Sequence, residues 1–156
     1  MSQKPSCDER YGRITNISTV WELSMLNKAY LGQHFELRIP ATLSQIKVAE
    51  AKAGLSFPKE YVDFLSITNG LNSTGCLALH EIEILPERNV EYEVQKYLPG
   101  YFMIGDDSGG QAILINSAGE VFEVGMGVMN PNFLERSADS LTDLLVNLKG
   151  LTLGER

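Results

Sequence analysis

Residues 101–124 read YFMIGDDSGGQAILINSAGEVFEV, and this stretch decides the fold class. Three short apolar segments, residues 101–104, 112–115 and 121–124, are separated by turn-forming residues. Short apolar runs bounded by glycine, asparagine and aspartate are typical of consecutive antiparallel strands. The stretch therefore predicts a three-stranded meander. Because residues 112–115 are apolar at every position, we expect this strand to be central and covered on both faces.

The turn between the first two of these strands, residues 105–110, combines three glycines with Asp106 and Asp107. Glycine permits positive φ, so we expect a sharp loop that leaves both carboxylates in water. Paired carboxylates at a strand end are compatible with a catalytic site, a metal site or a contact surface. Residues elsewhere in the chain decide among these three.

A serine nucleophile is the first candidate, because residues 107–110, DSGG, resemble the nucleophile segment of chymotrypsin-like proteases. Such a serine needs a base within hydrogen-bond reach and a group that orients the base. Only His34 and His80 could serve as the base, and neither stands in a recognisable context. We therefore expect Ser108 to be a turn residue, and the chain to have no catalytic site.

Helical patterns lie on both sides of the meander. Apolar residues at helical spacing predict four helices, at residues 17–31, 42–53, 58–68 and 140–148. The second begins at a T-x-x-Q capping box, residues 42–45, and stops at Gly54. Residues 77–79 are a candidate strand, residues 81–97 a strand end with a short helix after Pro86, and residues 125–136 a loop. This order predicts an α+β domain whose sheet is mainly antiparallel and flanked by helices.

The composition restricts the possible partners. The chain has 156 residues with a formal net charge of −7, so we expect one domain over residues 1–156, with residues 1–13 loosely held. The negative charge disfavours nucleic acid and anionic membranes and favours a basic protein. Neither an apolar leader nor a run of about 18 apolar residues is visible, so the expected location is the cytoplasm.

Metal and cofactor sites are not indicated. The cysteines, Cys7 and Cys76, are too few for a disulfide framework, and with His34 and His80 they show no metal-ligand spacing. The calcium-loop, phosphate-loop and dinucleotide-loop patterns are absent as well. We expect Cys76 to be a small buried residue, His80 to be a polar strand-end residue, and the protein to bind no metal or cofactor.

The acidic segment, residues 81–93, is the remaining functional signal. With the first turn of the meander it supplies the candidate partner-binding residues: Glu81, Glu83, Glu87, Glu91, Tyr92, Glu93, Asp106 and Asp107. Composition alone slightly favours a solvated face, which charge runs usually form. The alternative is a contact surface, in which carboxylates steer a partner and tyrosines anchor it.

Two segments together resemble the SUKH superfamily, the Smi/Knr-type proteins. Residues 55–65, LSFPKEYVDFL, followed by Asn69 and Gly70, are similar to the family's LP-x-x-Y-x-x-F-L…NG helix. Residues 102–115, FMIGDDSGGQAILI, are similar to its IG-x-D-x-x-G hairpin and the strand after it. The resemblance covers roughly residues 40–148, and the order and spacing of the two segments also fit.

The resemblance implies an antiparallel α+β fold and a binding function. Bacterial members are mostly thought to be immunity proteins that neutralise polymorphic toxins, many of them nucleases, and fungal members are intracellular adaptors in cell-wall synthesis. The favoured interpretation is a non-catalytic immunity protein for a basic toxin. The alternatives are a regulatory adaptor and, third, an unrecognised hydrolase. Two positions depart from the family pattern: Phe57 lengthens the space before Pro58, and Gln111 replaces a commonly acidic residue.

Overall fold

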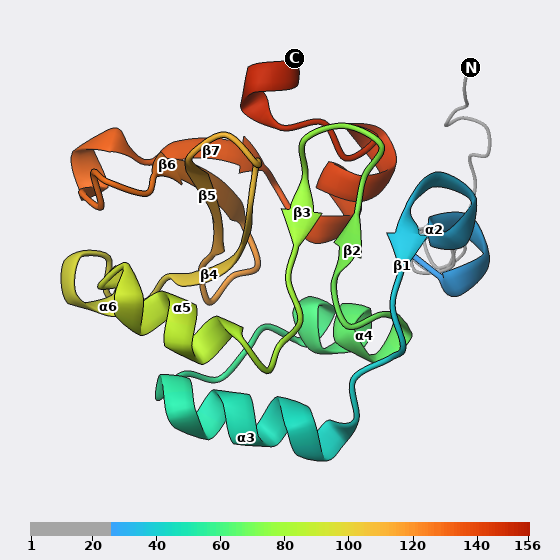
Figure 1. The fold of residues 1–156 in the computed structure, drawn as a ribbon, viewed down its shortest axis with the longest axis horizontal. Helices are drawn as coiled ribbons and strands as arrows, with labels where there is room; N and C mark the ends of the chain where they lie inside the picture. The colour runs from blue at the N-terminus through green and yellow to red at the C-terminus, as the bar shows by residue number, and fades with distance from the viewer. Residues whose placement is uncertain (1–25) are drawn as a thin grey trace, which may run out of the picture.

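The computed structural model describes residues 26–156, and the predicted α+β class is confirmed (Figure 1). The described residues form a seven-stranded antiparallel sheet whose strands follow the order of the sequence from one edge to the other. The strands are β1 (Glu36–Leu37), β2 (Leu71–Asn72), β3 (Ala78–Leu79), β4 (Phe102–Asp106), β5 (Gln111–Ile115), β6 (Val121–Gly125) and β7 (Glu135–Ala138). No crossover is needed within this sheet, because each strand pairs with its neighbours in the sequence.

The predicted meander is confirmed as β4, β5 and β6. Strand β5 lies at its centre and pairs with β4 on one side and β6 on the other. Ile113 and Ile115 belong to the main core, whereas Ala112 and Leu114 belong to a second apolar cluster. Since successive side chains on a strand alternate between its faces, the predicted burial of this strand on both faces is also confirmed.

Helices and loops cover the two faces of the sheet. The helices are α2 (Lys28–His34), α3 (Leu43–Ala53), α4 (Lys59–Ile67), α5 (Leu85–Glu91) and α6 (Val94–Tyr97), with short helical turns η1 (Pro131–Phe133), η2 (Asp143–Asn147) and η3 (Leu153–Glu155). Phe64 of α4, Leu85 of α5 and Leu145 of η2 pack in the main core. Val94 of α6 and Met129 of the β6–β7 loop pack in the second cluster. Figure 1 shows α5 and α6 end to end below the sheet, with α3 alongside α5.

Local sequence signals place the ends of α3 as predicted. The Gln45 amide donates to Thr42 Oγ1 at 3.1 Å, and the Thr42 amide donates to Gln45 Oε1 at 2.8 Å, so the capping box is complete. Gly54 ends the helix with a φ of 67°, in the left-handed region that favours glycine. Pro58 immediately precedes α4, where its missing N–H costs nothing.

Three strands were not predicted. Strands β1 and β2 have two residues each, too few for the alternation of apolar and polar residues that identifies a strand. Strand β7 begins at the end of the predicted loop 125–136 and runs beyond it to Ala138, and its sequence, ERSA, has no apolar pattern. These short or polar strands form because the neighbouring strand presents its backbone to them, which sequence periodicity cannot show.

Several helix boundaries differ from the prediction. Helix α2 runs to His34, beyond the expected end at residue 31, and α5 begins at Leu85, before Pro86. The C-terminal helix is confirmed, but after residues 141–142 it continues as a π-helix over Asp143–Asn147, and the Leu148 amide donates to the Asp143 carbonyl at 2.9 Å. The predictions for residues 1–13 and for the beginning of the helix at 17–31 lie outside the described residues.

Candidate interaction surface

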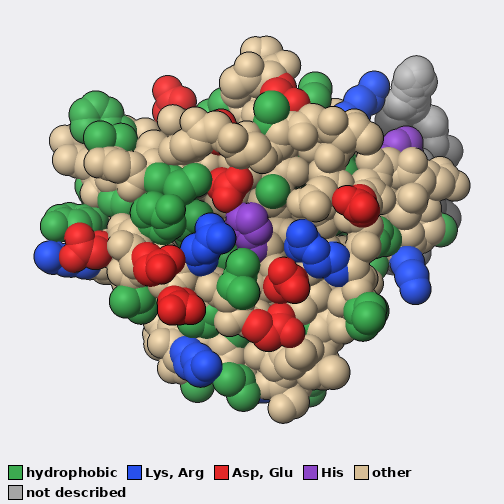
Figure 2. All heavy atoms as spheres, viewed as in Figure 1, with side chains coloured by type: hydrophobic (Ala, Val, Ile, Leu, Met, Phe, Trp, Pro, Cys, Tyr) green, Lys and Arg blue, Asp and Glu red, His purple; other side chains and the backbone are tan. Residues whose placement is uncertain are grey.

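The acidic segment lies on one face of the molecule, where Figure 2 shows carboxylate side chains gathered over α5 and α6 with lysine or arginine between them. Glu81, Glu87 and Glu91 are exposed. None of these three carboxylates has an ion pair within the described residues. Glu93 differs, because the Lys96 ammonium lies 3.4 Å from its carboxylate. Within residues 26–156, these three carboxylates are thus available to an external cation.

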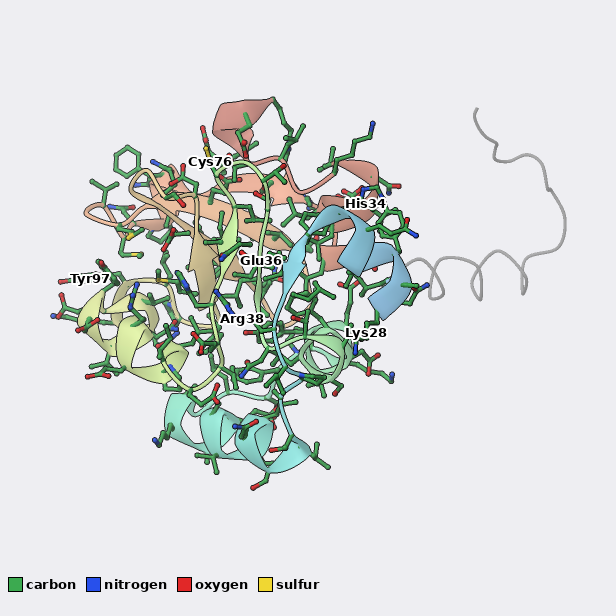
Figure 3. The ribbon with its side chains drawn as sticks, turned by 45° about the vertical axis from the view of Figure 1, so that its right-hand side comes forward. Lys28, His34, Glu36, Arg38, Cys76 and Tyr97 are labelled. Carbon is green, nitrogen blue, oxygen red and sulfur yellow. The ribbon has the colours of Figure 1, made fainter. Side chains whose placement is uncertain are left out.

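The tyrosines of this region are placed differently from one another. Tyr92 is half-buried and packs against the second apolar cluster. Tyr97, at the end of α6, is 45% exposed and lies at the periphery of the molecule (Figure 3). The Lys96 ammonium lies 5.0 Å from the centroid of the Tyr97 ring. Tyr97 therefore offers more aromatic surface than Tyr92. Both tyrosines belong to the charged segment, but only Tyr92 was chosen as a candidate partner-binding residue, because sequence spacing does not reveal exposure.

Glu83 is exposed, yet its carboxylate is already hydrogen-bonded within the protein. Gln45 Nε2 donates to Oε2 at 2.9 Å, and Asn69 Nδ2 donates to Oε1 at 2.7 Å. Asn69 Oδ1 also accepts from the Ile82 amide at 2.8 Å. Asn69, which follows α4 in the chain, therefore fixes the beginning of the acidic segment from a distant part of the sequence.

The carboxylates of the β4–β5 turn are also occupied, and the expectation that both extend into water is wrong. The Asp106 side chain is 14% exposed, and its Oδ2 lies 2.7 Å from His80 Nε2. Asp106 Oδ1 accepts from the Ser108 amide at 2.9 Å, and Asp107 Oδ1 accepts from the Gly109 amide at 2.8 Å. Aspartates in tight turns commonly accept from the backbone two residues ahead. In this structure both side chains shape the turn.

Two glycines in the segments that carry the family resemblance permit close backbone approach. A side chain at Gly105 would overlap the Ala78 carbonyl oxygen, where β4 pairs with β3. Gly70 has a φ of 88°, and a side chain there would overlap the Leu79 carbonyl oxygen. Both glycines therefore let β3 pack closely against its surroundings, directly before the acidic segment.

Asn89 fastens α5 to the sheet. Its Oδ1 accepts from the Met103 amide at 2.8 Å, and its Nδ2 donates to the Met103 and Leu85 carbonyls at 3.0 and 2.8 Å. Strand β4 pairs with β3 only at Gly105 and Asp106, so the Asn89 amide group satisfies the edge of β4 at Met103 as a backbone partner would. This buried contact orients the carboxylates of α5, and no sequence pattern indicated it.

In the part of the chain that the structure describes, neither Ser108 nor Cys76 is placed as an activated nucleophile. Ser108 has a φ of 63°, as a turn residue can, and its Oγ donates to the Cys76 carbonyl at 2.9 Å. His80 is hydrogen-bonded to Asp106, and among the described residues no serine or cysteine side chain is bonded to it. Cys76 is exposed at the β2–β3 turn (Figure 3), contrary to the expected burial. The charge of Glu155 raises the pKa of the Cys76 thiol, which favours its unreactive protonated form.

A groove and a cavity on the described surface bear on the candidate site. A groove of about 180 Å³ lies between α3 and α5 and is lined by Ser44, Gln45, Val48, Ala49, Lys52, Ile82, Glu83 and Pro86. A cavity of about 280 Å³ lies among Leu55, Phe57, Phe102 and Ile115. The groove borders the acidic segment, whereas no carboxylate lines the larger cavity. The groove is therefore the hollow that belongs with the candidate surface.

In the part of the chain that the structure describes, no helix is long and apolar enough to span a bilayer, and no cluster of three or more potential ligands is placed to hold a metal ion.

Comparisons with known proteins show what this chain is similar to. An 80-residue stretch is 31% identical to the uncharacterized protein YnaB of Bacillus subtilis (strain 168), covering about half of each chain, 51% of this one and 54% of the relative. Residues 40–147 match the SMI1/KNR4 family, SUKH-1, and this range contains the helix, the hairpin and the acidic segment described above. The chain therefore belongs to the SMI1/KNR4 (SUKH-1) family.

Proposed function

We propose that this protein is a non-catalytic immunity protein of the cytoplasm that binds a basic toxin domain, such as a nuclease, and blocks it. The observation that carries the proposal is the set of three exposed carboxylates, Glu81, Glu87 and Glu91, without an ion pair within the described residues. Family membership supports it, because the bacterial SUKH proteins are mostly thought to be immunity proteins.

The residues of the candidate surface divide into two roles under this proposal. The carboxylates of Glu81, Glu87 and Glu91 meet the cationic groups of the toxin, with Tyr92 and Glu93 beside them. Glu83, Asp106 and Asp107 already accept hydrogen bonds, so they hold the surface in shape. The net charge of −7 attracts a cationic domain to the protein. The carboxylates of the acidic segment then compete with the phosphates that a nuclease binds.

Co-expression with a candidate toxin domain tests the proposal, and the gene adjacent to this one is the first place to look for such a domain. The intact protein should restore growth and bind the domain, and Glu87→Lys and Glu91→Lys should each slow association by about tenfold or more. Glu36→Lys is the matched control, because Glu36 is exposed on β1, at the other side of the molecule from α6 (Figures 1 and 3). Raising the salt from about 0.15 M to about 1 M should reduce the difference between the variants, since the Debye length falls from about 8 Å to about 3 Å.

Two results would contradict the proposal. If Glu36→Lys slows association as much as the α5 variants do, only net charge matters and the acidic segment is a solvated face. If the protein neither binds the toxin domain nor protects, and instead co-purifies with cell-wall synthesis enzymes, the alternative role of a regulatory adaptor is correct.

A further inference from the structure

The groove between α3 and α5 has an apolar floor that is large enough for one side chain. Ala49 and Ile82 are buried and form the floor together with Pro86, and Val48 stands at the lip with 51% of its surface exposed. The groove volume is about 180 Å³. An apolar cavity of about 150 Å³ holds benzene, so this groove has room for one aromatic ring or one branched aliphatic side chain.

The polar end of the groove is fixed by hydrogen bonds that span three parts of the chain. Gln45 Nε2 donates to Glu83 at 2.9 Å, while Gln45 Oε1 accepts from the Thr42 amide at 2.8 Å. Asn69 Nδ2 holds the other oxygen of Glu83 at 2.7 Å. These side chains are already ordered, so a ligand in the groove does not have to immobilise them, which is the main benefit of a preorganised site.

The charges around the groove indicate which ligand fits. Glu83 lines it, and Glu81 and Glu87, which flank this part of the acidic segment, are exposed and without an ion pair within the described residues. Lys52 is the cation among the lining residues, on the opposite helix. Figure 2 shows hydrophobic side chains interspersed with acidic ones over this part of the face. An apolar group attached to a cation matches both features.

We propose that this groove receives one apolar side chain of a basic protein partner, with a neighbouring cation of that partner against Glu81 and Glu87. The inference rests on the proposed function and deepens it, because it adds the buried anchor that a purely electrostatic surface lacks. Interfaces draw most of their binding energy from a few such anchors in desolvated pockets, whereas exposed charges mainly set the association rate.

A fragment titration tests the groove without the partner. Phenethylammonium carries an aromatic ring and a cation, and phenylacetate carries the same ring with an anion. With the methyl-labelled full-length protein, phenethylammonium should shift the methyl signals of Val48, Ala49 and Ile82 with a dissociation constant on the order of millimolar, as expected for so small a ligand. Phenylacetate should bind at least about threefold more weakly, which corresponds to about 0.65 kcal/mol.

A pair of variants separates the groove from the general surface. Val48→Ser removes the apolar lip without changing charge and should weaken phenethylammonium binding at least threefold. Val90→Ser is the control, because Val90 is 73% exposed on α5 but does not line the groove. Three results would overturn the inference. Val48→Ser could leave phenethylammonium binding unchanged, the two fragments could bind equally well, or binding could be centred on the cavity at Leu55 and Phe57. Failure of the fragment test would not change the interpretation of the toxin assay with Glu87→Lys. Conversely, if the groove binds the fragment but the protein does not protect against the toxin, only the immunity role is refuted.

Discussion

The substitution Glu60→Ala should destabilise the protein through a helix that is distant in the sequence. Glu60, in the first turn of α4, accepts from the Leu141 amide at 2.9 Å, the Thr142 amide at 3.2 Å and the Thr142 hydroxyl at 2.7 Å. Its carboxylate therefore satisfies the free N–H groups at the beginning of the C-terminal helix. A hydrogen bond to a charged group contributes about 1.5–3 kcal/mol, and removing the carboxylate leaves its partly buried donors without this partner.

The bonds from the Leu141 amide at 2.9 Å and from the Thr142 hydroxyl at 2.7 Å are the shorter and therefore stronger ones. Because both donors are only part-buried, water can replace some of the hydrogen bonding that Glu60→Ala removes. We expect Glu60→Ala to lower the free energy of unfolding by about 2–4 kcal/mol and Tm by roughly 4–16 °C. Urea unfolding followed by circular dichroism measures the change. The control is Asp63→Ala on the same helix, because Asp63 pairs with Lys59 in solvent and should cost within about 0.5 kcal/mol. Equal losses for the two variants would refute the capping role of Glu60.

Three further predictions concern the core and the exposed thiol. The Tyr61 hydroxyl is buried without a hydrogen-bond partner among the described residues. Tyr61→Phe should therefore raise the free energy of unfolding by about 1 kcal/mol. If urea unfolding instead shows a clearly lower free energy of unfolding for Tyr61→Phe, the hydroxyl is hydrogen-bonded. Leu145 is fully buried in the main core, so Leu145→Ala should cost about 2–5 kcal/mol, and a loss below about 1 kcal/mol would mean that the C-terminal helix is peripheral. The charge of Glu155 raises the pKa of the Cys76 thiol, so less thiolate is present near neutral pH. In a Cys7→Ser background, iodoacetamide should modify Cys76 slowly, and Glu155→Gln should make this reaction faster. Equal reaction rates with and without Glu155→Gln would contradict this electrostatic effect.

Much of the fold could be predicted from local signals. The capping box at residues 42–45, the left-handed Gly54 and the fully apolar segment 112–115 each depend on residues close together in the chain, and the structure confirms all three. Strands β1 and β2 could not be predicted, because a two-residue strand has no periodicity and forms only where another strand offers hydrogen bonds. The family resemblance, carried by two short motifs, was confirmed over residues 40–147.

The candidate surface shows where local information ends. The sequence by itself determined that carboxylates are dense in the acidic segment and in the turn after β4, since composition and turn chemistry are local properties. Only the tertiary structure decided which of them already have a hydrogen-bond donor within the described residues. Asp106 is held by His80, and Glu83 by Gln45 and Asn69, residues that are 14–38 positions away in the chain. A carboxylate becomes available to a partner only when folding brings no donor to it, and which donors arrive depends on the packing of distant elements.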